Sequence, residues 1–172
     1  MLRFIAERDH GLMRRLHRWQ APGWVRLWMV AATRGGDGWL WYAVLAGVLM
    51  FGGGTRLAAF AAGSLAALAG IAVFQALKRF TGRRRPCEIE PHCWAQLLPP
   101  DQFSFPSGHS ITAFAVAIAL SLFYPVARAP LLFCAGSVAA SRVVLGMHFL
   151  SDVVAGSVLG AALGFAAFAV FH

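Results

Sequence analysis

Five apolar segments, separated by short polar turns, make up most of the chain after residue 38. They cover about residues 39–51, 57–77, 107–124, 131–145 and 149–171. A helix needs roughly 20 residues to cross the hydrocarbon core of a bilayer. The second and fifth segments reach that length, whereas the first is short and the fourth has polar residues near its end. The pattern predicts an all-α fold, a polytopic bundle of transmembrane helices with five spans.

The first 36 residues follow a different pattern. Over residues 2–20, apolar positions are interspersed with the arginines Arg3, Arg8, Arg14, Arg15 and Arg18. This is typical of an amphipathic helix that lies in the membrane interface. Pro22 and Gly23 end the pattern, and a short apolar stretch follows over 24–33. Residues 20–34 are therefore a possible sixth span. We therefore expect one domain, 1–172, with an interfacial arm (1–36) and a transmembrane catalytic core (37–172).

Composition supports a membrane protein. The 172 residues are 59% hydrophobic and 13% charged, and the mean hydropathy is +0.64, whereas soluble domains average roughly a quarter charged. The net charge is +8, but the chain shows no basic stripe with interleaved aromatic residues outside the membrane-like segments. This excludes nucleic acid as a partner. The expected partners are the lipid bilayer, with its anionic headgroups, and a phosphate-bearing substrate.

Three polar clusters interrupt the apolar segments at their ends. The first is Lys78 with Arg85, the second is Ser107-Gly108-His109, and the third is Arg142 with His148 and Asp152. If five segments cross the membrane, all three clusters lie on one face. The interfacial arm then shares that face, whereas a sixth span over 20–34 would place the arm on the opposite face.

The third cluster suggests a nucleophile. His148 and Asp152 are four residues apart, which places them on one face of a helix. A carboxylate there can accept a hydrogen bond from one imidazole nitrogen and leave the other free to attack. The alternative is a structural pair that ties two helices together. Because charged groups are costly in a membrane, we favour a functional role.

The other two clusters suggest an anion site. Pro106 and Ser107 mark a helix start, where free N–H groups and the helix dipole favour an anion. Gly108 allows close approach, and His109 is placed to act as a general acid, although an ordinary cap with an interfacial histidine fits too. The cations Lys78, Arg85 and Arg142 suit phosphate, although each one alone is also an ordinary partner of a helix C-terminus. Their neighbours Arg79, Arg83 and Arg84 are expected to face solvent or lipid.

Cys87 and Cys93 share one loop, and their spacing permits a disulfide in an oxidising compartment. The rival interpretation is a metal site with His92, but this lacks a fourth ligand and the usual spacing. We expect no metal and no other cofactor.

Together the clusters carry a family resemblance. Lys78, six residues, then Arg85-Pro86 resembles the first signature of the type 2 phosphatidic acid phosphatase superfamily. Pro106-Ser107-Gly108-His109 resembles its second signature. Ser141-Arg142, five residues, His148, three residues and Asp152 resembles its third. All three occur in order with no position missing.

The resemblance implies metal-independent dephosphorylation by an all-helical protein. It implies that His148 is the nucleophile that forms a phosphohistidine, that Asp152 orients it, and that His109 protonates the leaving oxygen. It also implies a set of groups that hold the phosphoryl oxygens: Lys78, Arg85, Ser107, the Gly108 amide and Arg142. Membrane members of the family commonly have six spans, so the five convincing ones here are a departure at the N-terminus.

The leading hypothesis is a bacterial-type membrane lipid phosphatase. Its expected substrates are a polyprenyl phosphate or pyrophosphate, phosphatidylglycerol phosphate, or phosphatidic acid. We expect a multi-pass protein of the inner (cytoplasmic) membrane with its site facing the periplasm, although the cations of the 78–106 loop alone would favour the cytoplasm. The alternatives are a vanadium-dependent haloperoxidase and a non-catalytic phospholipid-binding or transport protein.

Overall fold

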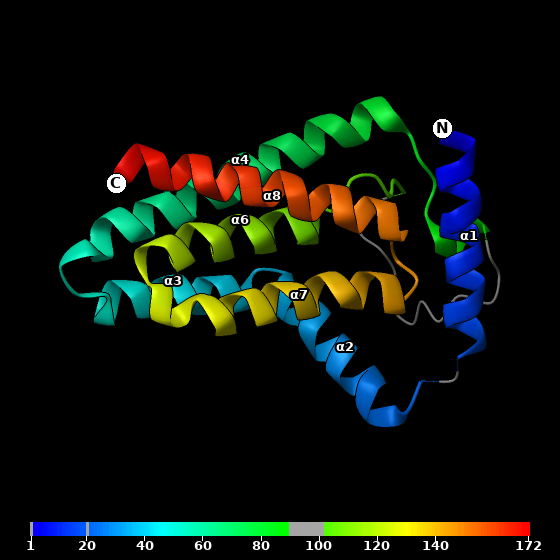
Figure 1. The fold of residues 1–172 in the computed structure, drawn as a ribbon, viewed down its shortest axis with the longest axis horizontal. Helices are drawn as coiled ribbons and strands as arrows, with labels where there is room; N and C mark the ends of the chain where they lie inside the picture. Colours follow the sequence, from blue (N-terminus) through cyan, green and yellow to red (C-terminus); the bar gives the residue numbers. More distant parts are fainter. Residues whose placement is uncertain (1, 20, 90–101) are drawn as a thin grey trace.

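The computed structural model describes residues 2–19, 21–89 and 102–172 (Figure 1). The central element is α6 (Gly108–Phe123), which packs against α4 (Arg56–Thr81), α7 (Arg128–Val144) and α8 (Leu150–Phe171). The bundle is completed by α3 (Trp39–Phe51), which lies beside α4. Two 3₁₀ turns, η1 (Gly53–Thr55) and η2 (Pro125–Ala127), join its helices at the end away from the polar clusters. No β-strand occurs among the described residues, where a single bridge pairs Arg84 with Phe103.

Glycines set the closest contact of the bundle, between α6 and α8. A Cβ added at Gly156 would lie 2.7 Å from the Ser107 carbonyl oxygen, and one at Gly160 would overlap the Ile111 carbonyl. Small residues at this spacing let helix backbones approach closely. The Ser107 N–H then donates to the Asp152 carbonyl oxygen at 3.1 Å. This contact brings the second and third polar clusters together.

Among the described residues, three helical stretches are long and apolar enough to cross a membrane: Gly53–Thr81, Pro125–Val144 and Leu150–Phe171. The second and fifth apolar segments are thus confirmed as long enough. The fourth is longer than its sequence pattern suggested, because its helical stretch begins at Pro125 rather than at 131. The apolar helix α6 is shorter, at 16 residues, and α3 has 13, so the five crossings stay a prediction.

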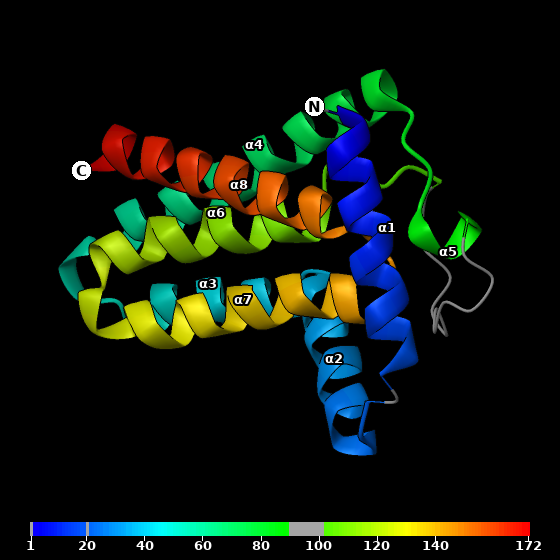
Figure 2. The same ribbon diagram turned by 45° about the vertical axis from the view of Figure 1, so that its right-hand side comes forward.

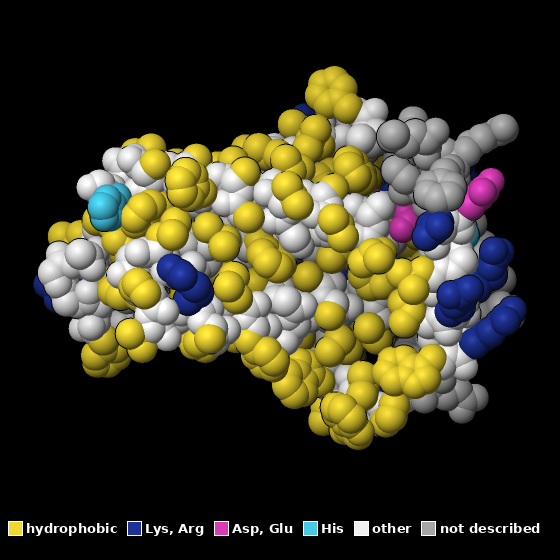
Figure 3. All heavy atoms as spheres, viewed as in Figure 1, with side chains coloured by type: hydrophobic (Ala, Val, Ile, Leu, Met, Phe, Trp, Pro, Cys, Tyr) yellow, Lys and Arg dark blue, Asp and Glu magenta, His cyan; other side chains and the backbone are white. Residues whose placement is uncertain are grey.

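The bundle surface that Figure 3 shows is largely apolar. Hydrophobic side chains are spread over its helices, and most of the visible Lys and Arg side chains lie at the end where α1 lies. Large apolar side chains such as Phe133, Val158 and Phe165 are exposed. Exposed apolar groups in this arrangement suit contact with lipid.

The N-terminal residues form two helices, α1 (Leu2–Arg18) and α2 (Gly23–Gly36). α1 lies across the end of the bundle where α8 begins, and α2 leans outward and packs against α7 (Figures 1 and 2). α1 buries Met13 against Val143, Phe149 and Val153 of the bundle. The predicted amphipathic helix is therefore present, and it lies at the end that carries the polar clusters.

Candidate active site

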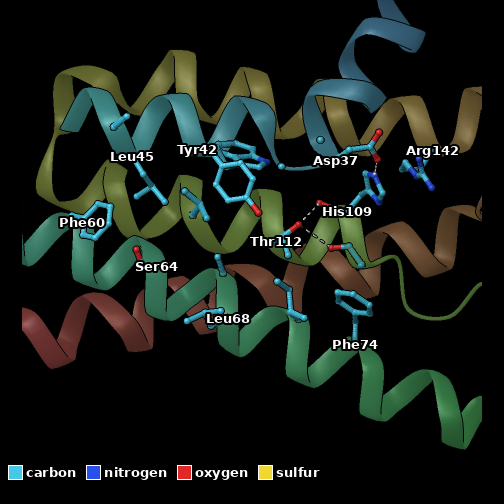
Figure 4. A pocket seen from close by; sticks show the side chains of 18 of the residues that line it. Asp37, Tyr42, Leu45, Phe60, Ser64, Leu68, Phe74, His109, Thr112 and Arg142 are labelled. Carbon is cyan, nitrogen blue, oxygen red and sulfur yellow. Dashed lines mark hydrogen bonds and ion pairs between the residues drawn. The ribbon is translucent and has the colours of Figure 1, made fainter. Parts of the chain in front are cut away.

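A cavity of about 620 Å³ lies between α3, α4 and α6 (Figure 4). One end is polar and the other is apolar, with Leu45, Phe60 and Leu68 among its lining residues. The predicted site residues that line its polar end are Lys78, Arg85, Gly108, His109, Arg142 and His148. The two other predicted site residues, Ser107 and Asp152, are fully buried. The structure therefore brings all three clusters to one place.

His148 lies in the short loop between α7 and α8, and it is 1% exposed. Two hydrogen bonds help to shape this loop: the N–H groups of Met147 and His148 both donate to the Arg142 carbonyl oxygen at 3.0 Å. Gly146 takes the positive φ of 70° that the reversal requires. The chain thus turns back directly after α7, which places Arg142 and His148 beside the same cavity.

The hydrogen bonds of the His148 ring define its tautomer. Nδ1 lies 2.6 Å from the Ser104 carbonyl oxygen, which can only accept a hydrogen bond. Nε2 lies 3.1 Å from Nη1 of Arg85, which can only donate one. Nδ1 therefore carries the proton, and Nε2 holds its lone pair toward the cavity end that Arg85 lines.

The surroundings of His148 favour the neutral ring. Burial lowers the pKa of His148 well below its usual value of 6.5, and the nearby cations Arg85, Arg142 and Lys78 lower that pKa further. A neutral imidazole is the form that can attack phosphorus.

Asp152 lies in the first turn of α8, beside His148. Its Oδ2 accepts the N–H of Phe149 at 2.9 Å, and its Oδ1 accepts from Nη1 of Arg83 at 2.7 Å. Oδ2 is 3.8 Å from Nδ1 of His148. The hydrogen bond that orients the ring thus goes to the Ser104 carbonyl, and the carboxylate adds a negative charge next to it.

The second cluster begins α6 as its spacing predicts. Ser107 is the N-cap, with extended backbone angles, and its Oγ accepts from the N–H of Ser110 at 3.4 Å and from the hydroxyl of Ser110 at 3.0 Å. His109 follows in the first turn, and its Nε2 lies 2.7 Å from Oδ1 of Asp37 (Figure 4). Asp37 belongs to the turn between α2 and α3. The N-terminal arm and the turn that follows it therefore reach the site.

Buried cations surround the polar end of the cavity. Nη1 of Arg85 also donates to the Met147 carbonyl oxygen at 2.8 Å, and Nη1 of Arg142 donates to Oγ1 of Thr33 on α2. Lys78 is buried, with its Nζ 5.3 Å from the centre of the Phe74 ring. Three cations around one small space make a strong anion site.

One sequence-based expectation is wrong. Arg83 does not face solvent or lipid, because its guanidinium binds Asp152 and also Asp9 of α1. Arg79 and Arg84 are exposed as expected. The reason for the difference is the path of the chain after Gly82, which ends α4 with a φ of 57°, and no local pattern distinguishes one arginine of this run from the next.

Several contributing groups had little or no signal in the sequence. Asp37 stands among glycines in the segment 35–38 and belongs to none of the three polar clusters. Thr33 and Asp9 lay in the arm, away from the clusters. Ser104 contributes a backbone carbonyl, which side-chain patterns do not reveal.

The cysteine loop lies largely outside the described residues. His92 and Cys93 fall within 90–101, so neither the disulfide that the spacing of Cys87 and Cys93 permits nor the rival metal site is described. Within the described ranges, no three His, Cys, Asp or Glu side chains come together in a way that could hold a metal ion.

Comparison with known proteins identifies the family. The model of the PAP2 superfamily matches residues 57–172, which is well over half of the chain. The chain therefore belongs to this superfamily, as the three signatures suggested. The matched region includes every predicted site residue but neither Asp9 nor Asp37.

Two curated relatives are phosphatases by name. A lipid A 1-phosphatase of Rhizobium johnstonii is 38% identical over 89 residues, which are 49% of this chain and 36% of that protein. A decaprenylphosphoryl-5-phosphoribose phosphatase of Mycobacterium tuberculosis is 35% identical over 131 residues, 74% of this chain and 68% of that one. The chain thus matches about a third of the length of the first relative and about two thirds of the second.

Two solved structures share the fold. A transmembrane PAP2-type phosphatidylglycerolphosphate phosphatase of Bacillus subtilis superposes with a TM-score of 0.76 at 25% identity, covering 96% of this chain and 85% of that one. LpxE of Aquifex aeolicus superposes with a TM-score of 0.75 at 24% identity, covering 92% of this chain and 93% of that one. Both alignments extend over nearly the whole chain.

Proposed function

We propose that this chain is a membrane lipid phosphatase that works through a phosphohistidine at His148. The observation that carries the proposal is the tautomer of His148: its Nε2 lone pair lies at the cation-lined end of a cavity whose other end is apolar. Such a cavity suits a molecule with a phosphate head and a hydrocarbon tail. The phosphatase names of the relatives point to the same chemistry.

In the first step, Nε2 attacks phosphorus, and the ester P–O bond breaks as the P–N bond forms. Lys78, Arg85 and Arg142 stabilise the charge on the phosphoryl oxygens, together with the N–H groups at the start of α6. The positive charge that develops on the ring of His148 is stabilised by the Ser104 carbonyl and by the Asp152 carboxylate. His109 gives its proton to the leaving oxygen.

In the second step, water attacks the phosphohistidine. His109, now neutral, takes a proton from this water, the P–N bond breaks, and inorganic phosphate leaves. The residues of this chain supply positioning and charge, which are the main requirements of phosphoryl transfer.

The lipid tail would occupy the apolar end of the cavity, between α3 and α4. Tyr42 and Leu68 line the cavity and are largely exposed on the bundle surface, so the cavity opens sideways toward lipid. We propose that the substrate is a polyprenyl phosphate or pyrophosphate, phosphatidylglycerol phosphate or phosphatidic acid. The substrates that the relatives' names indicate, lipid A 1-phosphate among them, belong in the same test panel.

We further propose five crossings of the inner membrane, with the site and α1 on the periplasmic side. Because α1 lies at the site end, the arm and the site share one face. Single cysteines in place of Arg15 on α1 and Val126 at the opposite end, in a chain without its three native cysteines, test this placement. A membrane-impermeant maleimide should label position 15 in intact spheroplasts and position 126 only after lysis, and the reverse pattern would exclude the proposed orientation.

The mechanism is tested with purified protein and a ³²P-labelled lipid phosphate in EDTA. Rapid quenching should trap an acid-labile, base-stable phosphoryl group on the wild-type chain and none on His148→Ala. His172→Ala, at the exposed C-terminus, is the matched control and should label normally. Label in His148→Ala, or a strict metal requirement, would contradict the proposal, and bromide oxidation by the vanadate-loaded protein would favour the haloperoxidase.

A further inference from the structure

Arg83 lies between two buried carboxylates from opposite ends of the chain. Its Nη1 donates to Oδ1 of Asp152 at 2.7 Å, and its Nη2 donates to Oδ2 of Asp9 at 2.8 Å. The side chain of Asp152 is fully buried, that of Asp9 is 6% exposed and that of Arg83 is 26% exposed. One guanidinium therefore joins α1 to the carboxylate beside His148.

Ser151 closes this network. Its hydroxyl accepts from Nη1 of Arg83 at 2.7 Å and donates to Oδ2 of Asp9, and its N–H donates to Oδ1 of Asp9 at 3.2 Å. Both carboxylate oxygens of Asp9 thus accept hydrogen bonds from Ser151, and Oδ2 also accepts one from Arg83, which binds Asp152. Asp9 fastens α1 to the first turn of α8.

Aromatic and apolar contacts around Phe149 also join α1 to the start of α8. The guanidinium of Arg83 lies over the ring of Phe149, 4.3 Å from the ring centre. The ring of His10 contacts the same Phe149 ring edge-on, with 5.0 Å between the ring centres. Met13 is buried against Phe149. Phe149 directly follows His148, so α1 packs against the loop that carries the nucleophile.

The charges explain why the arrangement matters for the site. A buried carboxylate is costly unless it is paired and hydrogen-bonded, and a planar guanidinium pairs with two acceptors only when its orientation is fixed. Asp9 binds Nη2 of Arg83, whereas Asp152 binds Nη1 of the same guanidinium. With Asp9 in place, Arg83 cannot turn toward solvent, and Oδ1 of Asp152 keeps its partner while Oδ2 keeps the Phe149 N–H.

We propose that Asp9 and Arg83 are positioning residues of the phosphatase, and that the α1 helix must be docked through them for His148 and Asp152 to hold their reactive geometry. The inference rests on the proposed function. It assigns a role to a residue of the arm that lies outside the family-matched region, 57–172. Asp9 touches no substrate in this scheme and acts only through Arg83 and Ser151.

The test compares steady-state kinetics of full-length variants in detergent micelles that contain the lipid phosphate. Asp9→Asn should lower kcat roughly 10-fold and leave KM nearly unchanged, the size typical of losing a group that orients a reactive residue. Arg83→Gln should lower kcat at least as much. Because both act through one contact, the double variant should be no worse than Arg83→Gln alone.

Matched controls lie next to each residue. Glu7→Gln also turns a carboxylate into an amide, at an exposed position of α1. Arg84→Gln also removes a guanidinium, from the exposed neighbour of Arg83. Both should keep wild-type kcat. Arg83→Lys keeps the charge but not the fork that binds two carboxylates, so it tests the idea even if Asp9→Asn or Arg83→Gln does not fold, and it should also lower kcat.

The outcomes are separable. Wild-type kcat in Asp9→Asn, or additive losses in the double variant, would overturn the positioning role while the phosphatase stands. A change confined to KM would overturn it too, since it would place Asp9 in lipid binding. If the wild-type chain releases no phosphate from any lipid, the proposed function fails instead.

Discussion

The two histidines of the site have the same side chain but differ in burial and in hydrogen-bond partners. His148 lies in a loop, 1% exposed, with one nitrogen on a backbone carbonyl and the other on a guanidinium. His109 lies on α6 with its side chain 18% exposed, and it pairs with the 56% exposed carboxylate of Asp37. A dry position among cations keeps a lone pair available for attack. A mostly buried position beside a carboxylate that reaches the surface suits a group that exchanges protons with substrate and water.

The largest expected effect is at the buried histidine. His148→Ala should lower kcat by at least about 10⁴-fold on every substrate, because in the proposed mechanism every turnover passes through the phosphohistidine. Phosphate release from a lipid phosphate and from p-nitrophenyl phosphate measures this. If p-nitrophenyl phosphate were still hydrolysed at the wild-type rate, the histidine would not be the nucleophile.

His109→Ala should have a smaller effect that depends on the substrate. A positioned general acid contributes roughly 10² to 10⁴ in rate, so hydrolysis of an alkyl lipid phosphate should fall by that factor. Formation of the phosphoenzyme from p-nitrophenyl phosphate should fall far less, because p-nitrophenolate leaves without a proton. Equal losses on both substrates in single-turnover measurements would mean that His109 binds phosphate and does not donate the proton.

Asp37→Asn should have a still smaller effect. The amide can keep a hydrogen bond to Nε2 of His109 but loses the charge, so kcat for the lipid phosphate should fall roughly 10-fold. With p-nitrophenyl phosphate in single turnover the same variant should be close to wild type. Asp37→Glu gives the contrast, since it keeps the charge, and an identical loss in both variants would show that shape and not charge matters at this position.

The smallest expected effect is on the pH dependence of stability, which reports the burial of His148. Its pKa is lowered well below 6.5 in the folded protein, so the unfolded chain binds a proton there first as pH falls. Stability should therefore decrease below pH 6.5 by up to about 1.4 kcal/mol per pH unit from this group. Thermal unfolding in detergent from pH 7.5 to pH 5.5 should show a steeper loss for wild type than for His148→Gln, and parallel curves would contradict the assigned burial.

A similar contrast separates the parts of the site that the sequence could predict from those it could not. Lys78, Arg85 and Arg142 lie at helix ends, and the spacing of the apolar segments was enough to bring those ends to one face. The orientation of Arg83 depended on where the loop after Gly82 runs, and the Ser104 carbonyl depended on the backbone of a segment with no pattern. Asp9 and Ser151 are 142 residues apart, a distance over which no local periodicity carries information.

The sequence alone determined the membrane character of the chain, its helical segments, the three signatures and the family, because these follow from hydrophobic periodicity and from residue types at fixed spacing. Only the tertiary structure decided which tautomer His148 adopts, which arginine binds Asp152, and at which end of the bundle α1 lies. Those outcomes depend on contacts between distant segments and on backbone carbonyls. The physical reason is that a buried charge or ring nitrogen takes whichever partner the packed chain brings within hydrogen-bond distance.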